Sequence, residues 1–234
     1  MHAVAPNVAW PYPCWIAHRG AGELAPENTM AAFRLGAEHG FAMFECDVKL
    51  SADGEPFLLH DTELDRTTNG RGEAGLQTWD ALSRLDAGSW HGRPYAGEPL
   101  LRLEALARWL QALGMMVNLE IKPTPGDEVR TGRVVAQHVA RLWSLAHVKP
   151  LLSSFSTVAL EAARPAVRTP AGLHQHPQRR PGLQRPDERP AREALALDDP
   201  ALRIGEGQLE DLFCQIDGDG TSMHGVDSSR DPVS

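Results

Sequence analysis

Residues 42–50 read Ala-Met-Phe-Glu-Cys-Asp-Val-Lys-Leu, and this stretch decides the fold. A mostly apolar stretch of this length predicts a β-strand. Side chains two residues apart in a strand point to the same face, so Glu45 and Asp47 are expected to lie side by side. The stretch therefore predicts a strand that carries two carboxylates toward its carboxyl end.

The first half of the chain repeats this short apolar run, each time followed by a helical pattern. Further strands are predicted at 14–17, 56–59, 115–121 and 150–155. Helices are predicted from a cap at Asn28 or Thr29 to Gly40, from Leu103 to a stop at Gly114, over 135–142, and from a cap at Ser156 or Thr157 to Pro165. Alternating strands and helices favour an α/β fold built from successive βα units.

Two segments depart from this alternation. Residues 62–99 are rich in Gly and Thr and predict a long irregular insertion, with at most a short helix over 78–85. From residue 165 onward the composition changes, because eight of the 18 prolines fall there and Phe213 is the only aromatic residue. We therefore divide the chain into a domain at 1–164 and a Pro/Arg-rich tail at 165–234. The tail is expected to be poorly ordered, with at most isolated helical turns at 195–202 and 207–213.

Bulk properties exclude several classes of protein. The chain has 234 residues, which suits one domain and is short for a full eight-stranded barrel of about 250 residues. A net charge of −8 argues against nucleic acid as a partner. No apolar stretch approaches the ~20 residues that span a bilayer, and the N-terminus does not resemble a signal peptide. Three cysteines without a close pair fit a reducing compartment, so a cytoplasmic protein is expected.

Three carboxylates follow apolar strands. Glu45 and Asp47 share one strand, and the later run Asn118-Leu119-Glu120-Ile121-Lys122 repeats the spacing. In a closed parallel barrel, inward side chains at the carboxyl ends of strands meet at one end of the barrel. Glu45, Asp47 and Glu120 are thus candidate metal ligands, and a set made of carboxylates favours Mg²⁺ or Ca²⁺ over zinc. The alternative is three solvated charges at strand ends.

Two histidines, His18 and His60, each follow an apolar run as well. Histidine changes its charge near neutral pH, so a pair can serve as proton donor and proton acceptor. Two cations, Arg19 and Lys122, stand beside these positions and can hold phosphate oxygens, or can form ordinary surface ion pairs.

These positions form an ordered set of motifs: His18-Arg19-Gly20, Pro26-Glu27-Asn28-Thr29, Glu45-Cys46-Asp47, His60-Asp61 and Asn118-Leu119-Glu120-Ile121-Lys122. Between about residues 14 and 164 their order and spacing resemble the glycerophosphodiester phosphodiesterase family, in its cytosolic bacterial type. The resemblance implies a (β/α)₈ TIM barrel that hydrolyses glycerophosphodiesters to glycerol 3-phosphate and an alcohol, in the salvage of lipid head groups. The last barrel strands are not recognisable, so an incomplete barrel is expected.

The resemblance also implies roles for individual residues. His18 and His60 act as general acid and base, in an order that the sequence leaves open. Glu27 and Asn28 either support the site or cap a helix, and Asp61 either orients His60 or begins the loop. Arg66, in the insertion, either contacts substrate or has a structural role. The expected partner is a small-molecule diester, without stable membrane insertion, and the oligomeric state stays open.

Two other functions remain open at this point. An inactive truncated product or phosphoester-binding relic would follow from the missing strands. A lysophospholipase D or sphingomyelinase D-like enzyme would use the same scaffold on a larger lipid, although the family-like insertion argues against it. We also hypothesise that the tail replaces a family-like ending, through a shifted reading frame or a truncation.

Overall fold

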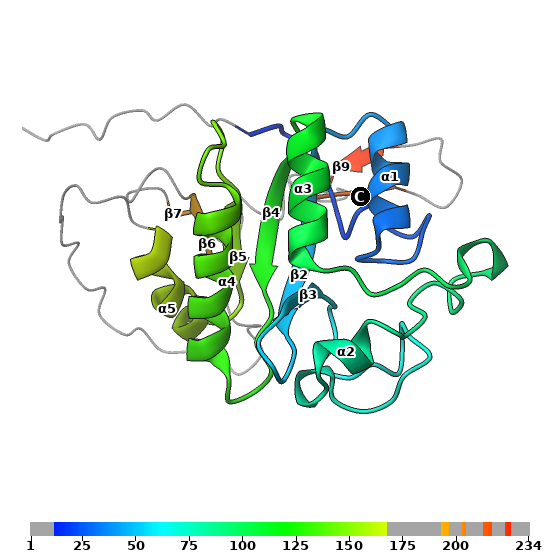
Figure 1. The fold of residues 1–234 in the computed structure, drawn as a ribbon. Coiled ribbons are helices and arrows are strands. Elements are labelled where there is room, and N and C mark those ends of the chain that lie inside the picture. The colour runs from blue at the N-terminus through cyan, green and yellow to red at the C-terminus, as the bar shows by residue number, and fades with distance from the viewer. Residues whose placement is uncertain (1–11, 168–192, 197–202, 205–212, 217–222, 226–234) are drawn as a thin grey trace, which may run out of the picture.

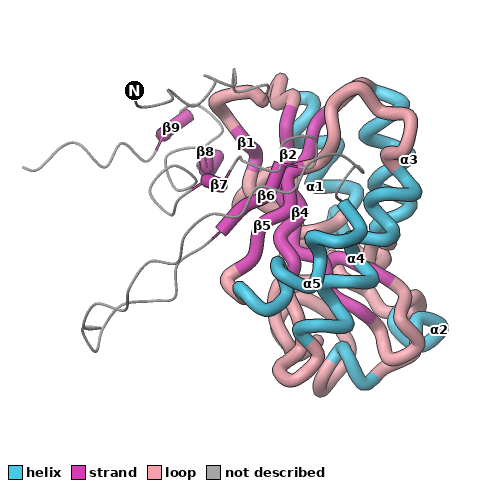
Figure 2. Tube along the Cα trace, turned by 90° about the vertical axis from the view of Figure 1, so that its left-hand side faces the viewer, coloured by secondary structure: helices cyan, strands magenta, loops and turns pink. Residues whose placement is uncertain are grey.

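A computed structural model describes residues 12–167, 193–196, 203–204, 213–216 and 223–225. Its centre is a mixed β-sheet, and the main helices cover one face of that sheet (Figures 1 and 2). Four parallel neighbours, in the order β5-β4-β2-β1, form the middle of the sheet: β1 (Ile16–Ala17), β2 (Met43–Leu50), β4 (Met116–Ile121) and β5 (Leu151–Ser154).

The helices that follow these strands cover the sheet: α1 (Met30–Glu38), α3 (Leu103–Leu113), α4 (Glu128–Leu142) and α5 (Thr157–Val167). Each places an apolar stripe in one shared core with the sheet. Phe33 of α1, for example, meets Phe44 of β2 with the two ring centroids 5.6 Å apart, and Trp109 of α3 meets the same ring at 6.0 Å.

Strand β2 explains how one sheet carries both a core and a polar site. Phe44, Cys46 and Val48 belong to the apolar core beneath the helices. The alternate side chains therefore point to the opposite face, and all of them are buried there: Glu45, Asp47 and Lys49. The prediction that Glu45 and Asp47 share a face is confirmed.

The predicted helix ends are found with defined caps. Thr29, rather than Asn28, caps α1, because its Oγ1 accepts a hydrogen bond from the Ala32 N–H. Gly114 ends α3 at φ +66°, the left-handed conformation that glycine adopts without a steric cost. Ser156 accepts from the Ala159 N–H at the start of α5, and this helix continues past Pro165 to Val167.

The apolar run at 56–59 is not a barrel strand, which corrects the expectation of a βα unit there. β3 (Pro56–Leu58) pairs antiparallel with β2, with Val48 opposite Leu58. Only five residues separate the two strands, and a parallel crossover needs a dozen or more. The run therefore folds back as a hairpin.

The insertion has the irregular character expected, with a short helix α2 (Trp79–Leu82) and two 3₁₀ turns, η1 (Ala74–Leu76) and η2 (Arg93–Tyr95). It has a small core of its own, and β3 contributes Phe57 to it. Buried Leu64, Leu82 and Leu100 belong to the same core. The insertion is thus fixed to the sheet through the hairpin.

The tail contributes four short strands: β6 (Glu193–Ala196), β7 (Arg203–Ile204), β8 (Phe213–Ile216) and β9 (Met223–Gly225). β6 pairs antiparallel with β5, and β8 pairs parallel with β1. The helical turn expected at 195–202 is wrong at its start, because Leu195 lies in β6. The turn expected at 207–213 is wrong at its end, because Phe213 lies in β8. The rest of both predicted turns lies outside the described residues.

The parallel βα repeat thus runs through α5 in the part of the chain that the structure describes. This is a barrel-type α/β fold whose later strands do not follow the βα pattern, as expected. Among the described residues, no helix has the length and apolar character to cross a membrane.

Candidate active site

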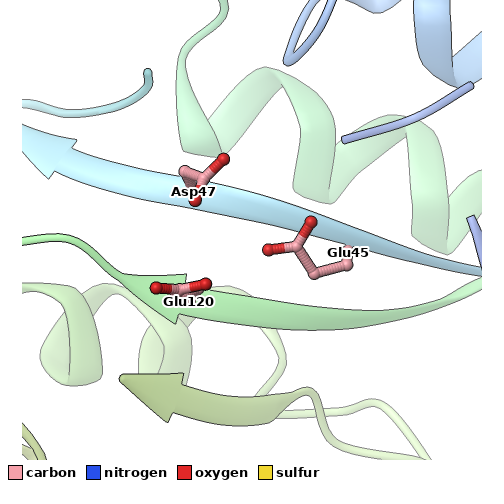
Figure 3. A group of neighbouring side chains, drawn as sticks. All are labelled: Glu45, Asp47 and Glu120. Atoms are coloured by element: carbon pink, nitrogen blue, oxygen red, sulfur yellow. The ribbon is translucent and has the colours of Figure 1, made fainter. Parts of the chain in front are cut away.

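Three buried carboxylates meet on the polar face of the sheet (Figure 3). Asp47 of β2 lies opposite Glu120 of β4 in the strand register, and Glu45 lies two pairs earlier, opposite Asn118. One oxygen from each carboxylate of Glu45, Asp47 and Glu120 lies within 4.8 Å of the other two. Buried hard oxygen donors at this spacing fit a divalent cation, so the structure brings together the three predicted ligands.

Asn28 holds Asp47 from the loop before α1. Its Nδ2 donates to Asp47 Oδ2 at 2.8 Å, and its Oδ1 accepts from the Asp47 N–H at 3.1 Å. The backbone of Asn28 adopts φ +59°, in the left-handed region that asparagine tolerates better than most residues. Asn28 therefore supports the site, while its neighbour Thr29 caps the helix.

Arg19 touches both the acidic cluster and Glu27. Its backbone N–H donates to Glu45 Oε2 at 3.1 Å, and its Nε lies 3.3 Å from Asp47 Oδ2. Its Nη1 donates to Glu27 Oε1 at 3.1 Å. Arg19 itself has φ +51°, which is unfavourable for arginine. Backbone strain of this kind is concentrated at functional sites.

Glycine allows this loop to approach α1 closely. A Cβ atom at Gly36 would stand 2.1 Å from the Gly20 carbonyl oxygen, and Gly20 itself has φ +101°. Any side chain at Gly36 would push the loop away from the helix. The two glycines therefore set the position of the residues that precede Gly20, which are His18 and Arg19.

Lys122 neutralises the other side of the cluster. Its Nζ lies 2.9 Å from Glu120 Oε1 and 3.8 Å from Asp47 Oδ1. The half-exposed ring of Phe155, just after β5, lies 5.2 Å from the same Nζ. Lys122 thus stands between buried carboxylates and an aromatic ring at the edge of the site.

The charges around Asp47 keep it ionised. Burial alone would raise its pKa, but Arg19, His60, Lys122 and the Asn28 hydrogen bond together hold the pKa below its ordinary value. An ionised carboxylate in such a cluster is the form that binds a metal ion.

The two predicted catalytic histidines both lie at the cluster. His18 Nε2 is 3.7 Å from Glu45 Oε2. His60 Nδ1 is 2.7 Å from Asp61 Oδ1. A carboxylate can only accept, so Nδ1 of His60 carries the hydrogen and Nε2 is the other ring nitrogen available for proton transfer. Asp61 therefore contacts His60 directly, besides beginning the loop.

Arg66 joins two of these motifs from the insertion. Its guanidinium donates to both oxygens of Asp61, at 2.6 and 3.1 Å, and to both oxygens of Glu27, at 2.8 Å each. The hydrogen bond from Arg66 is the main cause that lowers the pKa of Asp61. Burial alone would raise the pKa of Glu27. The Arg66 hydrogen bond and the charges of Arg19 and Arg66 outweigh burial, so the pKa of Glu27 lies below its ordinary value.

Lys49 lies on the face of the site although it belongs to none of the sequence motifs. It lies two positions after Asp47 on the same face of β2, and it is 2% exposed. Its Nζ donates to the Lys122 carbonyl oxygen at 3.3 Å. Burial, with the nearby charge of Lys122, lowers the pKa of Lys49 to about 8. The period of two that paired Glu45 with Asp47 also pointed to Lys49.

Known proteins are similar to the part of the chain that carries this site. The profile of the glycerophosphoryl diester phosphodiesterase family matches residues 18–176. The Bacillus subtilis protein YhdW is 43% identical over 124 residues, which are 52% of this chain and 51% of that protein. A glycerophosphodiester phosphodiesterase of Caldanaerobacter subterraneus is 41% identical over 127 residues, which are 53% of this chain and 52% of that protein.

Solved structures of phosphodiesterases are similar to this fold as well. A phosphodiesterase of Oleispira antarctica, in complex with the product sn-glycerol-3-phosphate, has a TM-score of 0.61 and 37% identity, over 65% of this chain and 62% of that one. A glycerophosphodiester phosphodiesterase of Agrobacterium tumefaciens has a TM-score of 0.57 and 34% identity, with the same coverage. The chain spans about half the length of the curated relatives that it matches.

Proposed function

Because the chain belongs to the glycerophosphoryl diester phosphodiesterase family, we propose that it hydrolyses glycerophosphodiesters to glycerol 3-phosphate and an alcohol. The observation that carries this proposal is the convergence of Glu45, Asp47 and Glu120 beside His18 and His60. The Oleispira relative that was solved with sn-glycerol-3-phosphate supports the same product.

A divalent cation fits this site, and we propose Mg²⁺ or Ca²⁺ held by Glu45, Asp47 and Glu120. Such an ion would supply electrostatic stabilisation of a phosphoryl oxygen and of an ionised hydroxyl. The choice of cation rests on the donor set, which consists of carboxylate oxygens from three buried side chains.

Arg19 and Lys122 would bind the phosphate. Both are partly exposed and lie at the rim of the buried carboxylates, so an anion at the opening would meet two positive charges. Arg19 offers a planar fork for two oxygens, and Lys122 offers a point charge. Phe155, over Lys122, would exclude water from one side of the bound group.

The two histidines would move the protons. One of them accepts a proton from the hydroxyl that attacks phosphorus, and the other donates a proton to the departing alcohol oxygen. By the family resemblance, the attacking hydroxyl belongs to the substrate's own glycerol, and water then opens the cyclic phosphate. His60, whose Nδ1 is held by Asp61, would use Nε2 for this transfer.

The test is release of glycerol 3-phosphate from glycerophosphocholine, with and without Mg²⁺ or Ca²⁺. His18→Ala is expected to abolish a metal-dependent release. His39→Ala is the matched control, because His39 is exposed beyond the end of α1 and should leave the rate unchanged. Release that persists in His18→Ala, or that ignores the metal, would contradict the proposal.

A second candidate is a phosphoester-binding protein without turnover. It is favoured by the antiparallel strand β6, which occupies the position beside β5 where a parallel barrel strand would continue. Binding of glycerol 3-phosphate without any product release from folded protein would support this candidate. The cytoplasmic location stays a prediction, to be tested by cell fractionation.

A further inference from the structure

Arg66 lies in the insertion, yet its side chain connects the Glu27 motif with the His60-Asp61 motif. Four of the five N–H donors of its guanidinium are engaged: Nε and Nη2 donate to Asp61, and Nη1 and Nη2 donate to Glu27. The carboxylates of Asp61 and Glu27 therefore hold the planar guanidinium of Arg66 between them. This leaves little of the guanidinium for a substrate phosphate, although its side chain is 44% exposed.

The backbone that carries Arg66 is fixed on both sides. Leu64 is buried in the core of the insertion, and its N–H donates to the Gly72 carbonyl oxygen. The N–H and the Oγ1 of Thr68 both donate to the Leu64 carbonyl oxygen. A short segment tied down at Leu64 and Thr68 presents the guanidinium in one place, so little order must be gained on substrate binding.

The bonds of Arg66 extend to a catalytic group on one side. Asp61 Oδ1 accepts from both Arg66 Nη2 and His60 Nδ1, and Oδ2 accepts from Arg66 Nε. With both oxygens held by a fork, the plane of the Asp61 carboxylate is fixed. The direction of the His60 ring is then fixed by its bond to Oδ1.

On the other side the bonds of Arg66 extend to Arg19, which is proposed to bind the phosphate. Glu27 Oε1 accepts from Arg66 Nη2 and also from Arg19 Nη1. The side chain of Glu27 is only 12% exposed, so solvent weakens this pair of bonds less than at an open surface. An unbroken chain therefore joins His60, Asp61, Arg66, Glu27 and Arg19.

We propose that Arg66 is a positioning residue, which sets the orientation of His60 through Asp61 and that of Arg19 through Glu27. In this way the insertion, and not only the barrel strands, determines where the proton-transfer group stands relative to the phosphate. The activity part of this inference rests on the proposed function. The geometric part concerns the His60 ring and can be measured without turnover.

The kinetic test compares Arg66→Lys and Arg66→Ala in the full chain with glycerophosphocholine and metal. A lysine keeps the charge but cannot make two forked pairs, so both variants are expected to lower kcat by about 10- to 100-fold. KM should rise by no more than about threefold, because Arg19 keeps its own contacts with Glu27 and Asp47 when Arg66 is replaced. The control is Arg71→Ala, since Arg71 lies in the same loop, is 80% exposed and pairs with Asp65 at the surface. Its rate should equal that of the unaltered protein.

Two kinetic outcomes would overturn the proposal. A rise in KM at unchanged kcat would make Arg66 a substrate contact. Unchanged kcat and KM with a lower melting temperature would make it a purely structural residue. A double variant, Asp61→Asn with Arg66→Ala, adds a third test. If Arg66 acts through Asp61, the double variant should be about as slow as the slower single variant, whereas multiplied losses would contradict that route.

The test without turnover is NMR of the His60 ring nitrogens, with the His60 signals assigned by their loss in His60→Ala. In the unaltered protein the neutral ring should carry its proton on Nδ1, and in Arg66→Ala this preference should weaken. Suppose that the unaltered protein releases no product, and that the preference for a proton on Nδ1 is lost in Arg66→Ala. The proposed function would then be refuted, while the positioning role of Arg66 would stand. An unchanged ring in an active protein would refute the positioning alone.

Discussion

Asn28 and Asp47 exchange two hydrogen bonds, one from the Asn28 amide to the Asp47 carboxylate and one from the Asp47 N–H back to Asn28 Oδ1. Both residues are almost fully buried. This pair connects the loop before α1 to the acidic face of β2. A candidate metal ligand is therefore oriented by a neutral side chain as well as by the charges of Arg19 and Lys122.

Asn28→Asp is expected to destabilise the protein at pH 7 by about 2–3 kcal/mol, because it replaces a donor with a second carboxylate. One of the two facing carboxyls would then have a pKa raised above its unfolded value. The penalty is therefore present at neutral pH and is relieved as pH falls through that raised pKa. Urea unfolding at pH 7 and pH 5 measures it, and an equal loss at both pH values would contradict the explanation.

Glu120→Gln is expected to abolish stabilisation by the metal. An ion that binds only the folded state raises stability by about 2.7 kcal/mol at 100 times its Kd. Thermal melts with Mg²⁺, Ca²⁺ or EDTA should thus separate for the unaltered protein and coincide for Glu120→Gln. Glu38→Gln is the control, because Glu38 is exposed at the end of α1. Melts that never respond to either ion would remove the basis for these ligands.

Lys49→Met is expected to stabilise the protein at pH 7. The pKa of Lys49 is lowered from 10.5 to about 8, so below pH 8 the fold holds a buried charge. Between pH 8 and 10.5 the unfolded chain binds the proton and the folded protein does not, so stability rises with pH in that window. The gain from Lys49→Met should be about 2–3 kcal/mol at pH 7 and should shrink toward pH 10. A gain that is independent of pH would point to better apolar contacts instead.

Replacement of residues 165–234 by the C-terminal third of a close relative is expected to raise both solubility and activity. The physical reason is that parallel barrel strands need neighbours on both edges, whereas β5 here is followed by antiparallel β6. Size-exclusion profiles and glycerol 3-phosphate release would measure the two effects. If the unaltered chain is already monomeric, melts cooperatively and turns over as fast as the chimera, the hypothesis of a replaced ending is wrong.

Local chemistry made much of the fold predictable. The alternation in β2 predicted the shared face of Glu45 and Asp47, and Gly114 predicted the end of α3 at a left-handed residue. The choice between Asn28 and Thr29 as the cap of α1 needed the structure. Both side chains can cap a helix, and only the distant partner Asp47 shows why Asn28 does not.

Other features depend on contacts that local sequence does not encode. The run at 56–59 is the exception, because the five residues after Leu50 already exclude a parallel crossover and so predict a hairpin. Arg66 has partners 5 and 39 residues away, and nothing in the insertion motif identifies Glu27 as one of them. The predicted site residues come together, while their assigned roles stay predictions for the experiments above.

The sequence positions of the acidic residues on β2 and β4 have a consequence for the order in which parts of the protein are synthesised. All ten predicted site residues lie between His18 and Lys122, and the acidic cluster needs only β2 and β4. Nearly half of the chain follows Lys122. During synthesis from the N-terminus, the ribosome therefore completes every ligand of the cluster before it begins the segment where the βα repeat ends. Synthesis of the candidate ligands and pairing of the tail strands with the sheet are therefore separate events for the nascent chain.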